Sequence, residues 1–141
     1  MGKGMTTVTQ GCVFDSNILI YHMNDQLDPE AHQAVLDLFD GPVYVSVISR
    51  IEVLAWRGHS DESRELADAL MRNFIEIGLN DTIVRKTIDI RRFQRVKLPD
   101  AIIAASAVSL DLPLVTRNIT DFGRVEDLRL INPFSRVRHQ P

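Results

Sequence analysis

The sequence predicts a three-layer α/β domain in which a mostly parallel sheet is covered by helices on both faces. Short, uniformly apolar runs alternate with helical patterns along the whole chain, and this order is typical of parallel strands buried on both sides. With 141 residues, 45% of them hydrophobic and 25% charged, the chain is long enough to bury a core and ordinary for a globular protein. We therefore expect one folded domain.

This domain is expected at residues 11–135. Residues 1–10 are small and polar, and Met5 offers a second start, so we interpret them as a flexible or artificially added segment; residues 136–141 form a C-terminal tail. The chain has no signal-peptide pattern, no apolar run of transmembrane length and a single cysteine, Cys12, which cannot form an internal disulfide. These features favour a cytoplasmic protein.

The first half of the chain begins with an apolar run at 11–15 that ends on an acid and predicts a buried strand. A helix follows from Ser16. Pro29 opens a second helix that continues to Phe39, and the Asp-Gly-Pro sequence at 40–42 ends it. Because the apolar run ends at Asp15, this acid is expected at the carboxyl end of the strand.

The middle of the chain repeats the alternation. Val43–Ser46 is a short β-rich strand, and Ser46 or Ser49 caps a helix that runs to about Arg57 and carries Glu52 and Trp56. The next helix is expected from Asp61 to about Asn73, with Leu66, Ala69 and Leu70 on one side, followed by a strand at 74–77. Asp81 is expected to cap the helix after that, which reaches the basic residues beyond 90.

The last part of the chain contains an almost wholly apolar helix. Pro99 cannot continue a preceding helix and favours an extended Leu98, so the helix is predicted to start at Asp100, as its N-cap or in its first turn, and to run to Leu110. Only serines interrupt its apolar surface, which indicates burial. The remaining elements are strands at 114–116 and 128–131, with a short helical turn near 118–122 between them.

Several acids are predicted to meet at one edge of the sheet. They follow strands or open helices: Asp15, Glu52, Asp100 and Asp121, with Asn118 nearby. Ligand sites of such folds lie outside the carboxyl ends of the strands. Converging carboxylates repel one another unless they share protons or bind cations, and oxygen ligands without histidine or thiolate favour Mg²⁺ or Mn²⁺. Such an ion activates water and stabilises a phosphodiester during its cleavage.

Each acid also has a purely structural interpretation. Asp15 and Asp100 stand where helix caps are common, and Glu52 could be an ordinary exposed acid on a helix. A run of positive charge, Arg91, Arg92, Arg95 and Lys97, leads to Asp100. It could supply affinity for phosphates or be a solvated helix face. The formal net charge of −3 argues against nucleic-acid binding by the whole surface but permits such a local patch.

Four segments resemble the PIN-domain ribonucleases in order and approximate spacing, and most closely the VapC-type toxins of bacterial and archaeal toxin–antitoxin pairs. The resemblance covers the chain from Cys12 to Phe134, and no single segment carries it. The segments are Val13–Tyr21, Ser49–Leu54, Leu98–Ala107 and Val115–Phe122.

The resemblance implies an endoribonuclease that depends on Mg²⁺, or on Mn²⁺ in its place, and cuts structured cellular RNA. Asp15, Glu52 and Asp100 match the three core acids of the family, as catalytic and metal-binding residues. Asp121 or Asn118 fills the fourth position, and we prefer Asp121 for its charge. Thr116 matches a hydroxyl that orients the site.

The same resemblance implies two protein partners. The chain is expected to form a homodimer and to be silenced by a small, DNA-binding, VapB-like antitoxin. The antitoxin's tail would lie along an apolar groove near the first two helices and could place a basic side chain in the acidic site.

Two other classes of function compete with this interpretation. One is a phosphatase in which Asp15 attacks phosphate, although Asn17 is a poor proton donor for that chemistry. The other is a non-catalytic module that keeps the fold and binds RNA or protein through its basic face. The retention of all three core acids favours the nuclease.

Overall fold

The computed structural model describes residues 10–135, and they form one five-stranded parallel sheet with helices on both faces. The predicted α/β fold is therefore confirmed. The expected terminal segments fall largely at 1–9 and 136–141, outside the described residues. No helix of the described part of the chain is both long and apolar enough to cross a membrane.

The sheet has the strand order β3-β2-β1-β4-β5. From β1 the chain moves outward to one edge, then returns to place β4 on the other side of β1. The order of the strands thus reverses beside β1, where ligand sites of such sheets form. The strands are β1 Cys12–Phe14, β2 Val43–Ser46, β3 Ile75–Ile77, β4 Leu114–Val115 and β5 Leu130–Ile131.

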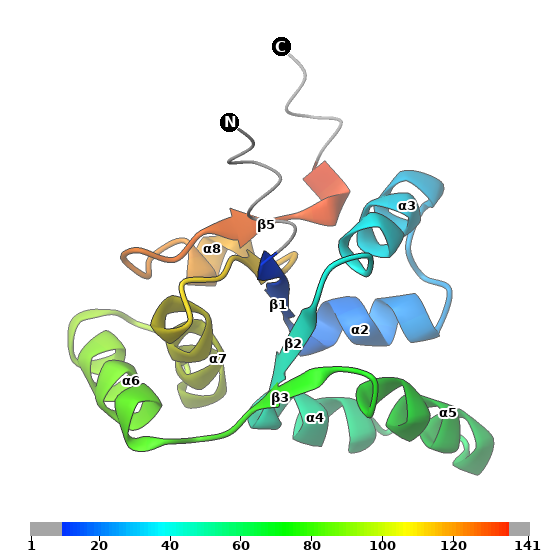
Figure 1. Ribbon diagram of the computed structural model, residues 1–141, viewed down its shortest axis with the longest axis horizontal. Helices are drawn as coiled ribbons and strands as arrows, with labels where there is room; N and C mark the ends of the chain where they lie inside the picture. The colour runs from blue at the N-terminus through cyan, green and yellow to red at the C-terminus, as the bar shows by residue number, and fades with distance from the viewer. Residues whose placement is uncertain (1–9, 136–141) are drawn as a thin grey trace.

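Alternate side chains of β1, β2, β4 and β5 enter two separate hydrophobic clusters, one on each face of the sheet. Val13 and Leu114 pack with the cluster of α6 and α7, whereas Phe14 and Val115 pack with that of α2, α3, α4 and α5. Figure 1 shows α6 and α7 on one side of β1 and β2, and α2 and α3 on the other. The helices are α2 Ser16–Met23, α3 Pro29–Leu38, α4 Val47–Leu54, α5 Asp61–Met71, α6 Asp81–Phe93, α7 Leu98–Ser109, α8 Ile119–Phe122 and the 3₁₀ helix η1 Pro133–Ser135.

The helix α7 is buried, as its composition predicts, but it begins earlier than expected. Every residue from 101 to 107 is buried. Leu98 is already helical, so the prediction that it is extended is wrong; the extended residue is Lys97, and Pro99 occupies the first turn, where its missing N–H costs no helical hydrogen bond. Asp100 therefore lies in the first turn, one of its two predicted positions.

Two predicted helix boundaries are also wrong. The helix α4 ends at Leu54 rather than near Arg57, because the chain turns back and the backbone N–H of Trp56 and the ring Nε2 of His59 both contact the Val53 carbonyl, the latter at 2.8 Å. The cap of α6 is Asn80 rather than Asp81, since its Oδ1 accepts the N–H of Ile83. Trp56 consequently lies beyond the helix that carries Glu52.

The side of α5 that carries Leu66, Ala69 and Leu70 is not the buried side. The helix buries Ala67 and Met71 instead, and leaves Leu66 68% exposed. Ala67 and Met71 belong to the hydrophobic cluster that also contains Val53 of α4. The last strand also starts later, at Leu130.

The close packing of α7 makes a prediction about stability. Ala104 is fully buried between the sheet and α6, so Ala104→Leu should lower the free energy of unfolding by about 1–3 kcal/mol. The control Ala69→Leu adds the same atoms at an exposed position of α5 and should change it by less than about 0.5 kcal/mol. Urea unfolding measures both, and equal effects would contradict the assigned packing.

Candidate active site

The predicted site residues lie at the carboxyl end of the sheet, beside the central strands β1 and β4. Asp15 follows β1 directly and precedes α2, and Thr116 follows β4 directly. Glu52 lies in α4, after β2, and Asp100 lies in the first turn of α7. Because all five strands run parallel, their carboxyl ends share one edge, and the acids meet there.

Asp15 is the most buried of these acids, with 4% of its surface exposed. Its Oδ2 accepts a hydrogen bond of 2.8 Å from the hydroxyl of Thr116. The pKa of Asp15 is raised to about 6, mainly by burial; the charges of Asp100 and Glu52 contribute to the rise, and the hydrogen bonds from Thr116 and the Ser16 N–H oppose it. Its side chain makes no capping bond to α2, so capping does not explain this aspartate.

Thr116 connects three parts of the site. Its backbone N–H donates to the Ile131 carbonyl of β5 at 3.0 Å, and its Oγ1 accepts the N–H of Asn118 at 3.0 Å while donating to Asp15. The hydroxyl is fully buried. Because Oγ1 accepts the Asn118 N–H, the hydroxyl proton is left to point at the Asp15 carboxylate. This geometry supports the orienting role that the resemblance implies.

Glu52 is oriented by a residue that the sequence analysis missed. The buried hydroxyl of Ser16, the first residue of α2, donates to Glu52 Oε1 at 2.8 Å. Ser16 is adjacent to Asp15, so two neighbouring positions of the chain serve two different carboxylates. A hydroxyl next to a strand-end aspartate was the available signal, but its partner on α4 is 36 positions away.

Asp100 differs from the other acids because no hydrogen-bond donor within residues 10–135 reaches its carboxylate. Burial raises its pKa, the charges of Glu52 and Asp121 add to this, and the charge of Lys97 opposes it. The electrostatic coupling shows that Asp15, Glu52, Asp100 and Asp121 are neighbours in space. A helix N-terminus stabilises the ionised form of such a residue, so burial and repulsion outweigh that here.

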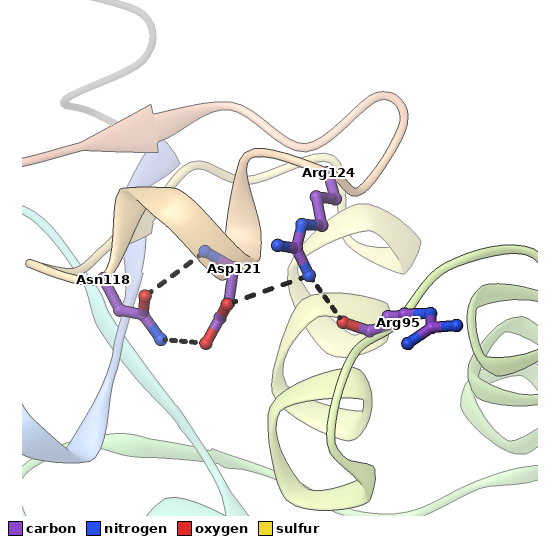
Figure 2. A network of polar contacts seen from close by, with 4 residues as sticks. All are labelled: Arg95, Asn118, Asp121 and Arg124. Carbon is purple, nitrogen blue, oxygen red and sulfur yellow. Dashed lines mark hydrogen bonds and ion pairs between the residues drawn. The ribbon is translucent and has the colours of Figure 1, made fainter.

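Asp121 is held from two sides (Figure 2). Asn118 accepts the Asp121 N–H at 3.3 Å and donates its side-chain amide to Asp121 Oδ2 at 3.2 Å. Arg124, a second residue that the sequence analysis missed, lies 4.0 Å from Oδ1 and donates to the Arg95 carbonyl at 3.1 Å. Asn118 thus caps α8 and orients Asp121, as a supporting residue, while Asp121 presents the charge.

The acids are close without forming a ready-made metal cage. Among residues 10–135, no three histidine, cysteine or acidic side chains are grouped so that they could hold a metal ion. The donor set nevertheless consists of carboxylate oxygens, with two raised pKa values that report unrelieved burial and repulsion. This chemistry fits a hard divalent cation, which would require the carboxylates to draw together.

The predicted basic residues are exposed but do not share one face. Arg91 turns inward to donate to the Val96 carbonyl at 3.0 Å, and Arg92 lies over the Phe93 ring at 5.2 Å. The backbone of Arg95 accepts Arg124, and its side chain extends away from Asp121 in Figure 2. Of these four residues, only Lys97 lies close enough to an acid of the site for its charge to lower that acid's pKa, that of Asp100.

Known proteins resemble this chain in both sequence and structure. The "Ribonuclease VapC10" of Mycobacterium tuberculosis is 31% identical over 132 residues, which cover 90% of this chain and 96% of that protein. A chain of the solved "Toxin-antitoxin complex from Klebsiella pneumoniae" is 30% identical with a TM-score of 0.71, covering 87% of this chain and 98% of that one.

DNA-bound VapBC from Salmonella typhimurium gives a TM-score of 0.75 at 20% identity, again over 87% of this chain and 98% of that one, which is a likeness of fold. The sequence matches the family model of the PIN domain over residues 12–128, from the first strand to the approach of the last. The span of that match and the identity to the ribonuclease show that this chain belongs to the PIN domain family.

Proposed function

We propose that this protein is a metal-dependent endoribonuclease and the toxin of a type II toxin–antitoxin pair. The observation that carries the proposal is the convergence of Asp15, Glu52, Asp100 and Asp121 at the carboxyl edge of a PIN-domain sheet. A ribonuclease relative of nearly the same length supports the reaction class, and the Klebsiella pneumoniae complex supports the pairing with an antitoxin.

Mg²⁺, with Mn²⁺ as a substitute, is the cofactor that fits these donors. Asp15, Glu52, Asp100 and Asp121 would hold it, because their oxygens are hard ligands and their charges repel in its absence. When bound, such an ion supplies an activated water and stabilises charge on the phosphodiester.

The surrounding residues prepare the acids for this role. Thr116 and Ser16 donate hydrogen bonds to Asp15 and Glu52, which hold these carboxylates in fixed rotamers, and Asn118 does the same for Asp121. Asp15 is shielded from water by the two central strands, so its charge is screened least and acts most strongly on a nearby cation.

We further propose a VapB-like antitoxin and a second copy of this chain as partners, and the cytoplasm as the location. The antitoxin rests on the toxin–antitoxin relative, the second copy on the resemblance to the VapC-type toxins, and the location on an RNA substrate and a single, buried cysteine. Burial raises the pKa of the Cys12 thiol to about 12, so the thiol stays protonated and this residue serves as an unreactive apolar side chain.

The reaction itself is the first prediction. The purified protein should cut total cellular RNA into discrete fragments with Mg²⁺ or Mn²⁺ and should be inactive with EDTA. Asp100→Asn should reduce the rate by at least about 100-fold, because it removes a charged ligand. Gel electrophoresis and end sequencing of the fragments give the measurement.

The matched control is Asp89→Asn, which makes the same change on the exposed face of α6 and should cleave normally. Cleavage that persists in EDTA or in Asp100→Asn would contradict the metal-dependent nuclease. Folded, metal-treated protein that binds RNA without cutting it would favour the binding module instead.

The raised pKa of Asp15 predicts a stability penalty with a defined pH dependence. The folded form binds the proton more tightly than the unfolded form, since its pKa is about 6 against 3.8, so the free energy of unfolding falls as pH rises from about 4 to 6. Asp15→Asn should therefore raise the free energy of unfolding at pH 7.5 by up to roughly 3 kcal/mol and change little near pH 4.

Urea unfolding at both pH values, without metal, measures this difference, with Asp89→Asn as the control. Adding Mn²⁺ should raise the melting temperature of the original protein and leave that of Asp15→Asn nearly unchanged. A gain that is equal at pH 4 and pH 7.5 would contradict the titration of Asp15 as its cause.

The basic residues give a further prediction. If Arg91, Arg92, Arg95 and Lys97 bind phosphates, replacing all four with alanine should reduce the slope of log affinity for RNA against log salt by about 0.7 for each phosphate that is no longer bound. Filter binding in the Asp100→Asn background measures the slope without cleavage. An unchanged slope would leave these residues as a solvated surface.

A further inference from the structure

Arg117 occupies the loop between two residues of the site, and its side chain is held by aromatic rings. Thr116 before it donates to Asp15, Asn118 after it orients Asp121, and the Arg117 carbonyl accepts the N–H of Ile119 at 3.0 Å. The guanidinium carbon of Arg117 lies 4.4 Å from the centre of the Phe134 ring and 5.8 Å from that of Tyr21. The backbone position of this arginine is thus fixed by the site itself.

The two rings form a support for the guanidinium. Tyr21 of α2 and Phe134 of η1 meet edge to face, with their centres 5.8 Å apart. A guanidinium that lies over an aromatic face keeps its N–H donors at its rim, where they can bind a planar or tetrahedral anion. The stacking also removes rotamer freedom before any ligand arrives.

The charge of Arg117 is not neutralised locally. The residue is exposed, and within residues 10–135 no carboxylate forms an ion pair with it. Arg124 and Arg129, by contrast, lie 4.0 and 3.3 Å from an aspartate oxygen. A cation held in one orientation beside an acidic site, without an acidic partner of its own, is available to an external anion.

The position of Arg117 relative to the sheet shows on which side of the acidic site that anion would bind. Tyr21 and Phe134 belong to the layer that contains α2 and α3, whereas Lys97, whose charge acts on Asp100, precedes α7 in the opposite layer. Figure 1 shows these layers on either side of β1. Asp15 follows the last residue of β1 directly. Positive charge therefore flanks the acids from both layers.

We infer that Arg117, stacked on Phe134 and Tyr21, binds a phosphate of the RNA strand on the α2 side of the acids, opposite the residues that precede α7. The inference rests on the proposed ribonuclease function and adds a positioning residue to it. A strand that crosses the edge of the sheet between the two basic sides places one phosphodiester over the carboxylates. Arg117 thereby fixes which phosphodiester of the bound strand lies over the acids, and it does not act on the reacting atoms.

The test compares Arg117→Ala with Arg72→Ala, which removes the same charge at the end of α5 that precedes β3, and hence at the opposite edge of the sheet. The probe is a 20-nucleotide single-stranded RNA of mixed sequence, bound to the Asp100→Asn protein over a range of salt concentrations. Arg117→Ala should weaken binding at low salt about 3- to 10-fold and reduce the salt slope by about 0.7, whereas Arg72→Ala should change neither.

Two further variants separate the charge from its support. Arg117→Lys should restore the salt slope but only part of the affinity, because it keeps the charge and loses the planar stack. Phe134→Leu should keep the slope and weaken binding. In the active protein, Arg117→Ala should raise KM for total-RNA cleavage and shift the cleavage positions, with kcat within about twofold, since only binding of the flanking phosphate is lost. Melting temperatures confirm that each variant is folded.

An unchanged salt slope in Arg117→Ala overturns the inference. If kcat falls while the slope is unchanged, Arg117 holds the conformation of its loop and does not bind a phosphate. An unchanged slope combined with weaker binding of a protein antitoxin assigns the stacked arginine to that partner and overturns the inference. If the active protein cuts no RNA but the slope still falls, the ribonuclease proposal fails while the phosphate contact stands.

Discussion

The hydrogen bond from Thr116 to Asp15 joins the two central strands at the point where the order of the sheet reverses. The residues of this pair are 101 positions apart, and they meet because β1 and β4 are adjacent and parallel. The bond fixes the most buried carboxylate of the site, and the loop that follows Thr116 presents Asn118 and Asp121 beside it. The positions of the other acids are set relative to this pair by the strands on either side.

The same arrangement opposes stability. Burial and neighbouring acids raise the pKa values of Asp15 and Asp100, which means that the ionised site is strained by its own charge. The surrounding core of fully buried alanines and branched aliphatic residues must offset this cost. A bound cation would reduce the repulsion between the acids, so the same repulsion that lowers stability favours binding of the proposed cofactor.

The sequence predicts the elements and the acids well because both follow from local rules. Apolar runs that end on an acid identify strand ends, and parallel strands bring those ends together. Features that depend on a distant neighbour were missed: Ser16 donates to a glutamate on another helix, 36 positions away, and Arg124 donates to the Arg95 carbonyl, 29 positions away. For α5, periodicity groups Leu66, Ala69 and Leu70 on one side but does not show which side faces the core, and the residues buried there are Ala67 and Met71.

The placement of charge reconciles an acidic protein with an RNA substrate. The net charge of −3 describes the whole chain, whereas a nucleic acid meets only the edge of the sheet. There, Lys97 lies beside Asp100 and Arg124 beside Asp121, so each of these acids has a cation next to it. Arg117 differs because aromatic rings rather than carboxylates hold it. A site built in this way repels a polyanion at its centre and attracts it at its flanks, and a divalent ion at the centre would turn that repulsion into attraction.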